Sequence, residues 1–427
     1  MANLNVNEID VLREIIHHSL KISIEQLADD LATEVDLLLP ILDKLSATKL
    51  FTRQNKTLVV DKEMRKYFEV EIEKFDENFR PDIEFMQTIL GKVPINILLT
   101  WYAIPRTSDN IFDSIIEKYL LTPKNYRLYL SELQFDNPIL NSIVKEVHTS
   151  PDFMVSTHDL MMKFNLNHEE LEESLLLLEY HFVCCVSYKK IEGKWKEMAT
   201  PFAEWRDFLS FNHQTKPRPL SKNSIHKTYP VEFAFIKDLA SILQASQTKQ
   251  SPYQNISNLH GSTDQQKETL AKKLIQLEFA VKVDSHTLSP TQKGNTWLSR
   301  PLVEQIALIA NDPLNRLAQH HEFSELWNMR NLGLIEKNLR RLSPLQWISF
   351  QNFFEGFIAP IGNHDPVILK NKGKKWQYTL PIYSENEKQF TQAVIMERLA
   401  QLGMVETGIA EGMSCFCLTP FGYHIVH

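Results

Sequence analysis

Glycine and cysteine are both scarce in this chain, and their scarcity narrows the folds that it can adopt. Only 12 of its 427 residues are glycine, which disfavours folds that need glycine-rich βα turns or many tight hairpins. The four cysteines occur as Cys184-Cys185 and as Cys415-Phe-Cys417. Neither spacing matches a zinc-binding CxxC pair or a disulfide framework. We therefore interpret them as buried thiols of a reducing cytoplasm.

Apolar runs long enough to cross a membrane are missing as well. A membrane-spanning helix needs ~18 or more apolar residues in succession, whereas the longest runs here are Phe182–Val186 and Ile306–Ala310. Residues 1–7 are polar and lack the basic flank and apolar centre of a signal peptide. The sequence therefore predicts a cytoplasmic protein with no membrane partner.

The motifs of nucleotide and hydrolase chemistry are absent too. No stretch matches the phosphate-binding GxxxxGK motif, the dinucleotide-binding GxGxxG motif or the GxSxG turn of a nucleophilic serine. His168-Glu-Glu170 and His320-His-Glu322 lack the spaced second histidine of a helical zinc site, and His17-His18 lies on diverging faces of one helix. We therefore predict a chain that is not an enzyme, with no catalytic residue, metal, cofactor or small-molecule substrate.

What the chain does contain is enough apolar side chains for several cores. Hydrophobic residues make up 43% and aromatic residues 10% of the sequence, which excludes a disordered chain. At about 100–200 residues per domain, the length predicts two to four domains. Leucines at helical spacing dominate, so the expected class is mostly α.

One sequence pattern recurs four times along the chain. A helix with leucines at helical spacing is followed by a short apolar strand, a polar turn, and a second strand or closing helix. Helical patterns precede the first two copies, and Ser23 with Gln26 forms a capping box before the first. Three helices and a two-stranded wing predict tandem winged helix-turn-helix units, mostly α with small β wings. The four copies cover residues 37–60, 171–205, 270–290 and 394–420.

Helical linkers are expected to join these units. Pro40 falls inside the predicted third helix of the first unit, where it must kink the helix or shift its start. The predicted segments are 1–80 for winged helix 1, 81–135 for a helical linker, 136–211 for winged helix 2, 212–230 for a basic exposed linker, 231–300 for winged helix 3, 301–341 for a helical connector and 342–427 for winged helix 4.

Residues 342–427 carry a likeness to a known family. The likeness rests on Leu342–Ser349, Trp376, Leu399–Glu406 and Leu418–Gly422. In these residues the segment resembles the winged-helix module of bacterial helicase-associated proteins related to the amino-terminal region of xeroderma pigmentosum group B helicases. The resemblance implies a role in DNA transactions or contact with a motor protein, without motor activity in this chain.

The net charge of −7 hides an acidic region before residue 206. The third helix of the second unit is the extreme case, because it carries five carboxylates and no lysine or arginine. The closely spaced charges of duplex DNA would repel such a helix. It is either a docking face for a basic protein partner or an ordinary solvated helix face. The docking residues would be Glu169, Glu170, Glu172 and Glu173, with Glu179 further along the helix.

Residues 206–300 have the opposite balance, with 13 Lys and Arg against 7 Asp and Glu. The third unit would therefore attract a phosphate backbone, and its third helix mixes amides and lysines suited to base edges and phosphates. The alternative for the third unit is an ordinary soluble basic surface, and the alternative for the basic loop of the last unit is a solvated turn around Gly373. The predicted nucleic-acid contacts are Lys216, Arg218, Lys222 and Lys227 in the linker, Gln265, Gln266, Lys267, Lys272 and Lys273 on the helix, Lys282 and Lys293 at the wing, and Lys372, Lys374 and Lys375 in a loop of the last unit.

Two functions are compatible with these patterns. The first is a non-enzymatic DNA-binding, helicase-associated or transcription-associated protein whose main contact is the third unit, with duplex DNA or a DNA-processing motor protein as partner. The alternative is a protein-interaction scaffold that uses acidic winged helices as docking modules for a basic protein and does not bind DNA directly. The acidic first two units favour docking, whereas the basic third unit favours nucleic acid.

Overall fold

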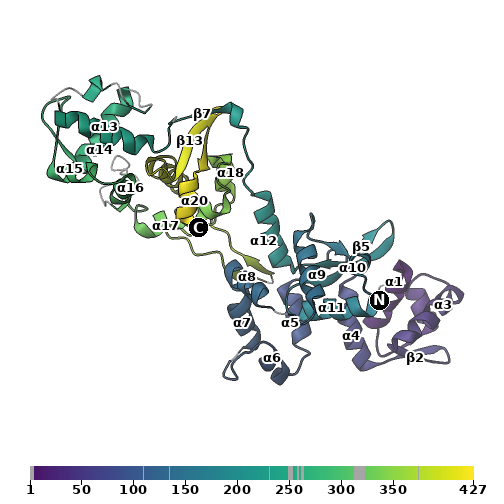
Figure 1. The fold of residues 1–427 in the computed structure, drawn as a ribbon. Helices are drawn as coiled ribbons and strands as arrows, with labels where there is room; N and C mark the ends of the chain where they lie inside the picture. Colours follow the sequence, from purple (N-terminus) through teal and green to yellow (C-terminus); the bar gives the residue numbers. More distant parts are fainter. Residues whose placement is uncertain are drawn as a thin grey trace. The chain divides into compact units, whose positions relative to one another are not determined.

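The computed structural model describes residues 4–427 apart from 109, 134, 230, 249–252, 257–258, 261–263, 312–322 and 374. The described chain is mostly helical, and its strands pair into small antiparallel sheets, so the predicted mostly-α class with small sheets is confirmed. The chain divides into two compact bodies (Figure 1). The N-terminal body comprises Met1–Ser210 and Ile368–Thr379, and the C-terminal body comprises Phe211–Val367 and Leu380–His427.

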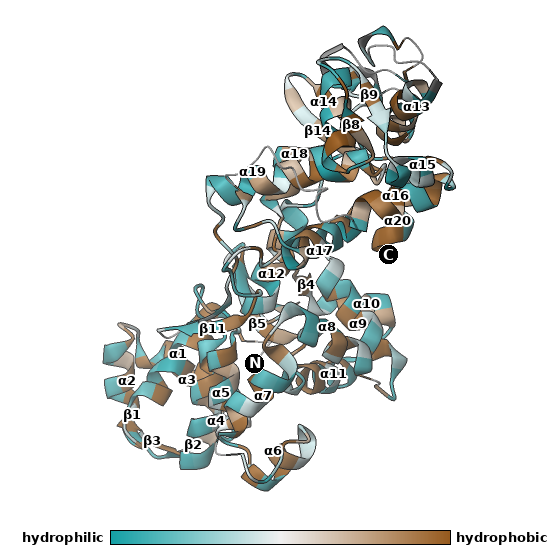
Figure 2. Ribbon diagram, turned by 90° about the vertical axis from the view of Figure 1, so that its left-hand side faces the viewer, coloured by the Kyte–Doolittle hydropathy of each residue, from teal (hydrophilic) through white to brown (hydrophobic). Residues whose placement is uncertain are grey.

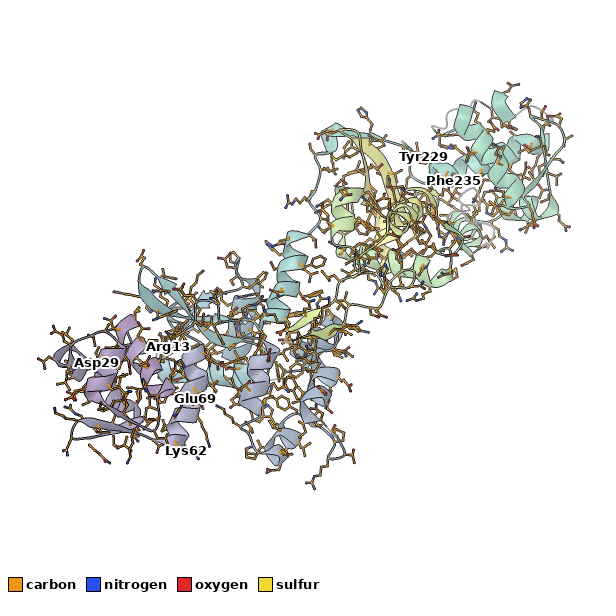
Figure 3. The ribbon with its side chains drawn as sticks, turned by 180° about the vertical axis from the view of Figure 1, so that it is seen from behind. Arg13, Asp29, Lys62, Glu69, Tyr229 and Phe235 are labelled. Atoms are coloured by element: carbon orange, nitrogen blue, oxygen red, sulfur yellow. The ribbon has the colours of Figure 1, made fainter. Side chains whose placement is uncertain are left out.

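The first repeat of the N-terminal body packs its helices against a three-stranded sheet of order β1-β3-β2. Apolar residues recur every three or four positions in α1, so Ile9, Leu12 and Ile16 share its buried face; α1 accordingly shows both polar and apolar residues in Figure 2. Arg13, labelled in Figure 3, pairs with Asp10 at 3.2 Å. The elements are α1 (Val6–His17), β1 (Lys21–Ser23), α2 (Ile24–Asp30), α3 (Val35–Leu45), β2 (Phe51–Gln54), β3 (Thr57–Val60) and α4 (Lys62–Glu73).

The second repeat has the same order of elements, and its sheet has the equivalent order β4-β6-β5. Short helices precede it, namely α5 (Ile83–Leu90), α6 (Ile95–Trp101), α7 (Ile111–Ile115), the π-helical turn η2 (Ile116–Leu120) and α8 (Pro123–Glu132). The repeat itself consists of α9 (Pro138–Thr149), β4 (Val155–Ser156), α10 (Thr157–Phe164), α11 (His168–Tyr180), β5 (Cys185–Ile191), β6 (Lys194–Thr200) and α12 (Ala203–Gln214).

A hairpin from late in the sequence belongs to the N-terminal body. β11 (Leu369–Lys372) pairs with β12 (Lys375–Tyr378). The Leu369 N–H donates to the Leu121 carbonyl at 2.7 Å, and the Tyr378 hydroxyl donates to the Leu120 carbonyl at 2.8 Å. The segment 342–427, which the sequence predicts to be one winged unit, is therefore divided between the two bodies by this hairpin.

The C-terminal body holds the third and fourth repeats around one continuous apolar core that includes Phe235 and Val426. The fourth repeat forms a four-stranded sheet of order β10-β14-β13-β7, and the third forms a two-stranded sheet. β7 (Ile225–Lys227) precedes the third repeat in the sequence but pairs with β13 in the sheet of the fourth. The elements of the third are α13 (Ala234–Thr248), α14 (Asp264–Gln276), β8 (Ala280–Lys282), β9 (Leu288–Pro290), α15 (Gln292–Leu298) and α16 (Leu302–Asn311). Those of the fourth are α17 (Met329–Asn338), β10 (Trp347–Ser349), α18 (Phe350–Glu355), α19 (Glu385–Ala393), the π-helical turn η7 (Val394–Leu399), β13 (Val405–Ala410), β14 (Met413–Leu418) and α20 (Pro420–Val426).

A capping serine begins the second helix in three of the repeats. Ser23, Ser156 and Ser349 each end a strand and accept a hydrogen bond from the backbone N–H three residues later, at 3.1, 3.0 and 3.1 Å. A hydroxyl at this position satisfies an N–H that the first helical turn leaves without a partner. The sequence indicated the first of these caps, and the same local chemistry sets the other two.

The turn from the third helix into the wing is also the same in all four repeats. A residue with positive φ ends the helix, and the leucine four positions before it is fully buried. In the last three repeats the residue after the turn donates its N–H to that leucine's carbonyl at 2.9 Å, as in a Schellman-type helix end. The turn residues are Lys49, Phe182, Glu278 and Gly403, and the leucines are Leu45, Leu178, Leu274 and Leu399.

The last two repeats share a further contact that explains the Leu-Thr-Pro-x-Gly motif. The Thr419 hydroxyl donates to the Gly403 carbonyl at 2.7 Å, and three residues later Gly422 lies against the Met404 carbonyl. The third repeat has the equivalent pair in Thr291 and Gly294. A methyl group on either glycine would overlap a backbone carbonyl. The closing helix can therefore reach the wing turn because a glycine stands there.

Glu204, at the start of α12, is an ionisable group inside the N-terminal body. Its side chain is 5% exposed, and its Oε1 accepts the Ile83 N–H at 3.1 Å. Burial raises the pKa of Glu204 from 4.5 to about 8, despite that hydrogen bond. The folded protein therefore keeps this carboxyl protonated at a pH where the unfolded chain has lost the proton.

We expect the stability of the protein to fall as the pH rises because of Glu204. The stabilising contribution of this carboxyl is complete below its unfolded pKa of 4.5 and is lost as the pH rises through its folded pKa of about 8. Glu204→Gln should flatten the decrease in the free energy of unfolding between about pH 5 and pH 8, measured by urea denaturation. Glu84→Gln, at an exposed position of α5, is the control and should keep the wild-type slope.

We also expect Gly422→Ala and Gly294→Ala to lower the free energy of unfolding by about 1–3 kcal/mol each, because the added methyl group meets a backbone carbonyl. Gly333→Ala is the matched control, since nothing lies within 4 Å of the added atom inside α17. That variant should gain up to about 1 kcal/mol from helix propensity. Equal denaturation midpoints for the three variants would contradict the proposed packing of the closing helices.

Candidate functional site

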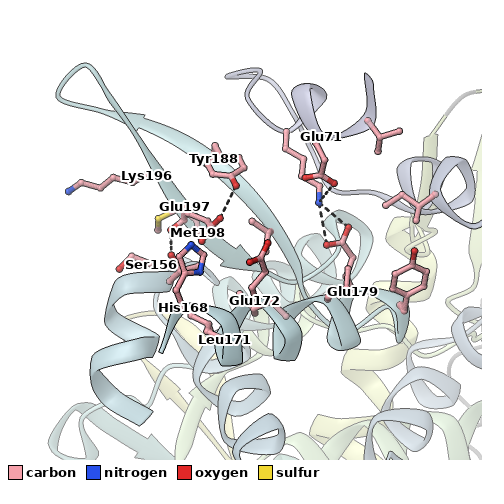
Figure 4. Close-up of a pocket in the computed structure, with 18 of the residues that line it drawn as sticks. Glu71, Ser156, His168, Leu171, Glu172, Glu179, Tyr188, Lys196, Glu197 and Met198 are labelled. Atoms are coloured by element: carbon pink, nitrogen blue, oxygen red, sulfur yellow. Dashed lines mark hydrogen bonds and ion pairs between the residues drawn. The ribbon is translucent and has the colours of Figure 1, made fainter. Parts of the chain in front are cut away.

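A cavity of about 1340 Å³ lies between the first and second repeats within the N-terminal body (Figure 4). Its walls are α4, α11, β4 with the start of α10, and the β5–β6 hairpin. Lys62 and Glu69 mark the course of α4 in Figure 3. We call this cavity the α4–α11 groove. Apolar side chains that line it include Tyr67, Val70, Leu171, Leu175, Leu176 and Val186.

A buried ion-pair cluster closes one end of the groove. The ammonium of Lys74, the C-cap residue of α4, lies 3.3 Å from Glu179 Oε1 and 3.3 Å from Glu71 Oε1. Lys74 and Glu179 are only 5% and 3% exposed. Burial disfavours the ammonium, but the attraction of the two carboxylates outweighs it and holds the pKa of Lys74 above its ordinary value. Burial raises the pKa of Glu179, although Lys74 acts in the opposite direction.

Aromatic and backbone contacts fix the same end of α4 to the wing. The Phe75 ring stacks on Tyr188 of β5 with a centroid distance of 3.7 Å, and Trp195 of β6 meets Phe75 edge-on. The Tyr188 N–H donates to the Lys74 carbonyl at 3.2 Å, and its hydroxyl donates to Glu197 at 2.7 Å. The end of α4 is thereby bound both to α11 and to the edge strand of the wing.

The other part of the groove combines apolar and acidic side chains. On α11, Leu171 and Leu175 are buried, whereas Glu172 and Leu176 are exposed. The side chains of Leu176 and of Tyr67 on α4 are 54% and 53% exposed. Figure 4 shows His168, Leu171, Glu172 and Glu179 along the side of α11 that borders the cavity. Large apolar side chains at this degree of exposure indicate a surface suited to a further binding partner.

The acidic residues singled out in the sequence separate into two groups. Glu169, Glu170, Glu172 and Glu173 are exposed on α11, and Glu172 lines the groove. Glu170 also accepts the Asn167 N–H in a capping box. Glu179, in contrast, is buried in the cluster with Lys74. Sequence reasoning missed Lys74, because nothing near it in the sequence points to a carboxylate 105 residues away.

The predicted basic linker contains a strand and provides fewer available charges than expected. Its segment β7 pairs with β13, and Lys227 of β7 forms an ion pair with Glu406 at 2.7 Å. This part of the segment is therefore structured, whereas the sequence predicted an exposed linker. Lys216, Arg218 and Lys222 are exposed. These three residues therefore stay candidates for contact with an anion, whereas Lys227 already has an acidic partner.

Two of the lysines predicted on the third helix and its wing pair with acidic neighbours. Lys272 pairs with Glu268 at 3.0 Å and Lys293 with Glu278 at 3.2 Å. Lys273 is 7% exposed, which leaves little of it for a phosphate. The remaining predicted residues are Gln266 and Lys267, which are half-buried, and Lys282, which is exposed on β8. The side chain of Gln265 and residue Lys374 lie outside the described residues.

The predicted nucleic-acid residues are divided between the two bodies. Lys372 and Lys375 are exposed and face each other across the β11–β12 hairpin of the N-terminal body. The other predicted lysines and Arg218 belong to the C-terminal body. The predicted set therefore includes residues of both bodies.

One cluster near the start of the chain has donor atoms of the kind that metals bind. His18 Nε2 lies 3.1 Å from Glu14 Oε1 and 2.9 Å from Asp30 Oδ2. These contacts already pair the histidine with both carboxylates, so the geometry is explained by an ion-pair cluster between α1 and α2. The histidines at 320 and 321 lie outside the described residues.

Comparison with protein families and with curated proteins found no relative of this chain. A scan against family models found no match for the chain, and no curated protein matches it. The resemblance of residues 342–427 to helicase-associated winged helices therefore stays a prediction from the sequence. Among the described residues, no helix has the length and apolar character needed to span a bilayer.

We expect Lys74→Met to destabilise the protein by about 3–5 kcal/mol, because it leaves the buried carboxylate of Glu179 without its cation. Methionine keeps most of the volume of the lysine side chain, so packing should change little. Lys66→Met is the matched control on the same helix, since the ion pair of Lys66 with Glu63 is exposed and should contribute less than about 1 kcal/mol. Urea denaturation at neutral pH measures both. Equal losses would mean that the buried cluster does not hold α4 against α11.

Proposed function

We propose that this chain is a non-enzymatic protein-interaction scaffold of tandem winged-helix units, and that the α4–α11 groove is its docking site. The order helix, strand, helix, helix, strand, strand, helix supports the winged-helix assignment, because it occurs in the first and second repeats, and in the fourth once the inserted β11–β12 hairpin is left out. In each of these repeats the first strand pairs with the third. The third repeat shares the helix-to-wing turn, which supports a fourth unit of the same kind.

One observation favours a protein partner over DNA, and it concerns the helix that would read a base sequence. In helix-turn-helix proteins the recognition helix lies in the major groove of the duplex. The equivalent helix of the second repeat is α11, whose end is bound to α4 through Lys74 and Glu179. A duplex would have to displace α4 and would also meet the exposed carboxylates of α11. A protein can use the same groove without either penalty.

The size of the groove supports a macromolecular partner rather than a small molecule. Pockets for small ligands usually enclose about 300–1,000 Å³, and the groove is larger, at about 1340 Å³. Its lining mixes apolar side chains with several charged ones. Such a surface resembles a protein–protein interface, in which an apolar centre is surrounded by a polar rim.

DNA binding by the C-terminal body is the second candidate function. Lys216, Arg218, Lys222 and Lys282 are all exposed in this body, and residues 206–300 are basic overall. Duplex DNA or a DNA-processing motor protein would be the partner. The ion pairs of Lys227, Lys272 and Lys293 reduce the charge available to phosphates, so this function ranks below the scaffold.

Photo-crosslinking in cells that express the full chain tests the two functions against each other. Benzoylphenylalanine in place of Leu176, in the groove, should capture a protein, and the adduct should survive nuclease treatment. The same residue in place of Met162, which is 72% exposed on α10 and does not line the groove, should not capture it.

A gel-shift titration with duplex DNA at about 150 mM salt completes the test, because binding through phosphates weakens steeply with salt. The scaffold predicts no shift. A salt-dependent shift that disappears when Lys216, Arg218 and Lys222 are each changed to Glu would establish the second candidate instead, as would the loss of every crosslinked adduct after nuclease treatment.

A further inference from the structure

We infer that the α4–α11 groove binds a basic amphipathic α-helix of about three turns from a protein partner. This inference rests on the proposed scaffold function and specifies the occupant of its docking site. The observations behind it are the dimensions of the groove, the distribution of its apolar and acidic side chains, and the state of the strand edge that borders it.

The volume of the groove is close to that of a short helix. An α-helix with its side chains is about 10–12 Å wide and rises 1.5 Å per residue, so a cylinder of about 10 Å diameter and about 17 Å length fills the volume of the groove and holds about 11 residues. The groove encloses about 1340 Å³. An extended peptide with the same number of residues would be about twice as long. The groove is therefore large enough to hold about three turns of helix.

A strand could not easily add to the wing at this place. The wing has the strand order β4-β6-β5, so β5 is an edge strand that would otherwise accept an added strand. However, the N–H of Tyr188, in the middle of β5, already donates to the Lys74 carbonyl at 3.2 Å. The stacked Phe75 ring lies against Tyr188 at the same point. The end of α4 thus protects the edge, and the occupant must bind through its side chains.

The apolar side chains of the groove lie on two facing helices. Leu171, Leu175 and Leu176 of α11 and Tyr67 and Val70 of α4 border the same cavity. Leu171 and Leu175, four residues apart, share the buried side of α11, and Leu176 lies beside them at the exposed rim. A helix with apolar residues at positions three and four apart would place its own stripe between α4 and α11, as amphipathic helices do in other hydrophobic grooves.

The charge of α11 selects a basic helix rather than an acidic one. Glu172 borders the groove and is exposed, while the neighbouring Glu169 and Glu173 add negative charge on the same helix. Among the lysines that line the groove, Lys66 pairs with Glu63 and Lys74 with Glu71 and Glu179. Lys92 donates to the Lys66 carbonyl, and Lys196 is exposed on β6 at the far wall. Lysine or arginine on the polar face of the bound helix would meet this acidic rim, which favours association and discriminates against acidic helices.

The test measures the fluorescence anisotropy of a labelled 14-residue peptide with leucine at every third and fourth position and lysine elsewhere, titrated with the full chain. We expect saturable binding that weakens as salt is added. Leu176→Asp should weaken binding at least about ten-fold, because it places a charge in the apolar centre. Glu172→Lys should weaken it about five-fold through the rim charge. Circular dichroism confirms that these exposed substitutions leave the fold intact.

Matched controls distinguish binding in the groove from nonspecific binding elsewhere on the protein. Met162→Asp places an aspartate at an exposed apolar position outside the groove, and Glu132→Lys reverses an exposed charge on α8 that does not line the cavity. Both should bind within about two-fold of wild type, since surface charges contribute little on their own. A peptide of the same composition in scrambled order, and a peptide with glutamate in place of lysine, should not bind.

Two outcomes would overturn the inference. One is equal binding of the lysine and glutamate peptides, and the other is wild-type affinity for Leu176→Asp together with Glu172→Lys. If either occurred while the crosslink at position 176 persisted, the scaffold function would stand and its occupant would be of another kind, such as a second copy of this chain. If the crosslink were lost as well, the docking site itself would be wrong.

Discussion

The buried ammonium of Lys74 between Glu71 and Glu179 is the interaction on which the arrangement of the first two repeats depends. Apolar contacts alone would allow α4 to slide along α11, because hydrophobic burial has little directional preference. A buried charge, in contrast, costs several kcal/mol unless its partner is in place. The cluster therefore selects one relative position of the two helices, and the shape of the α4–α11 groove follows from it.

Features that depend on neighbours along the chain could be predicted from the sequence. The leucine spacing indicated four repeats, and each of these segments does contain a helix followed by a pair of antiparallel strands, because a buried stripe and a turn are set within about twenty residues. Leu178 and Phe182 show why. The leucine anchors the last helical turn, and the residue four positions later takes the positive φ that starts the wing. The serine cap at Ser23 belongs to the same class of local signals.

Contacts between distant parts of the chain could not be predicted in this way. Helical periodicity shows which face of α4 is buried but not which element covers it, so the pairing of Lys74 with Glu179 has no sequence signal. The hairpin at 369–378 is a second example. Its residues look like a solvated basic turn of the last unit, yet Tyr378 donates to the Leu120 carbonyl of the N-terminal body. A single sequence holds no information about such a partner.

The same limit applies to the charges of segment 206–300, because a count does not show which of them have partners. Segment 206–300 is basic by composition, but a phosphate responds to the local field, and Lys272 and Lys293 each lie about 3 Å from a glutamate. Pairs of this kind cancel most of their field within a Debye length of about 10 Å. On α11, in contrast, pairing leaves most of the negative charge exposed. Its one buried carboxylate, Glu179, is the one that pairs, whereas Glu172 keeps its exposed position beside the groove. Pairing thus lowers the number of available charges on the basic segment, whereas the carboxylates of Glu169, Glu170, Glu172 and Glu173 stay exposed on α11.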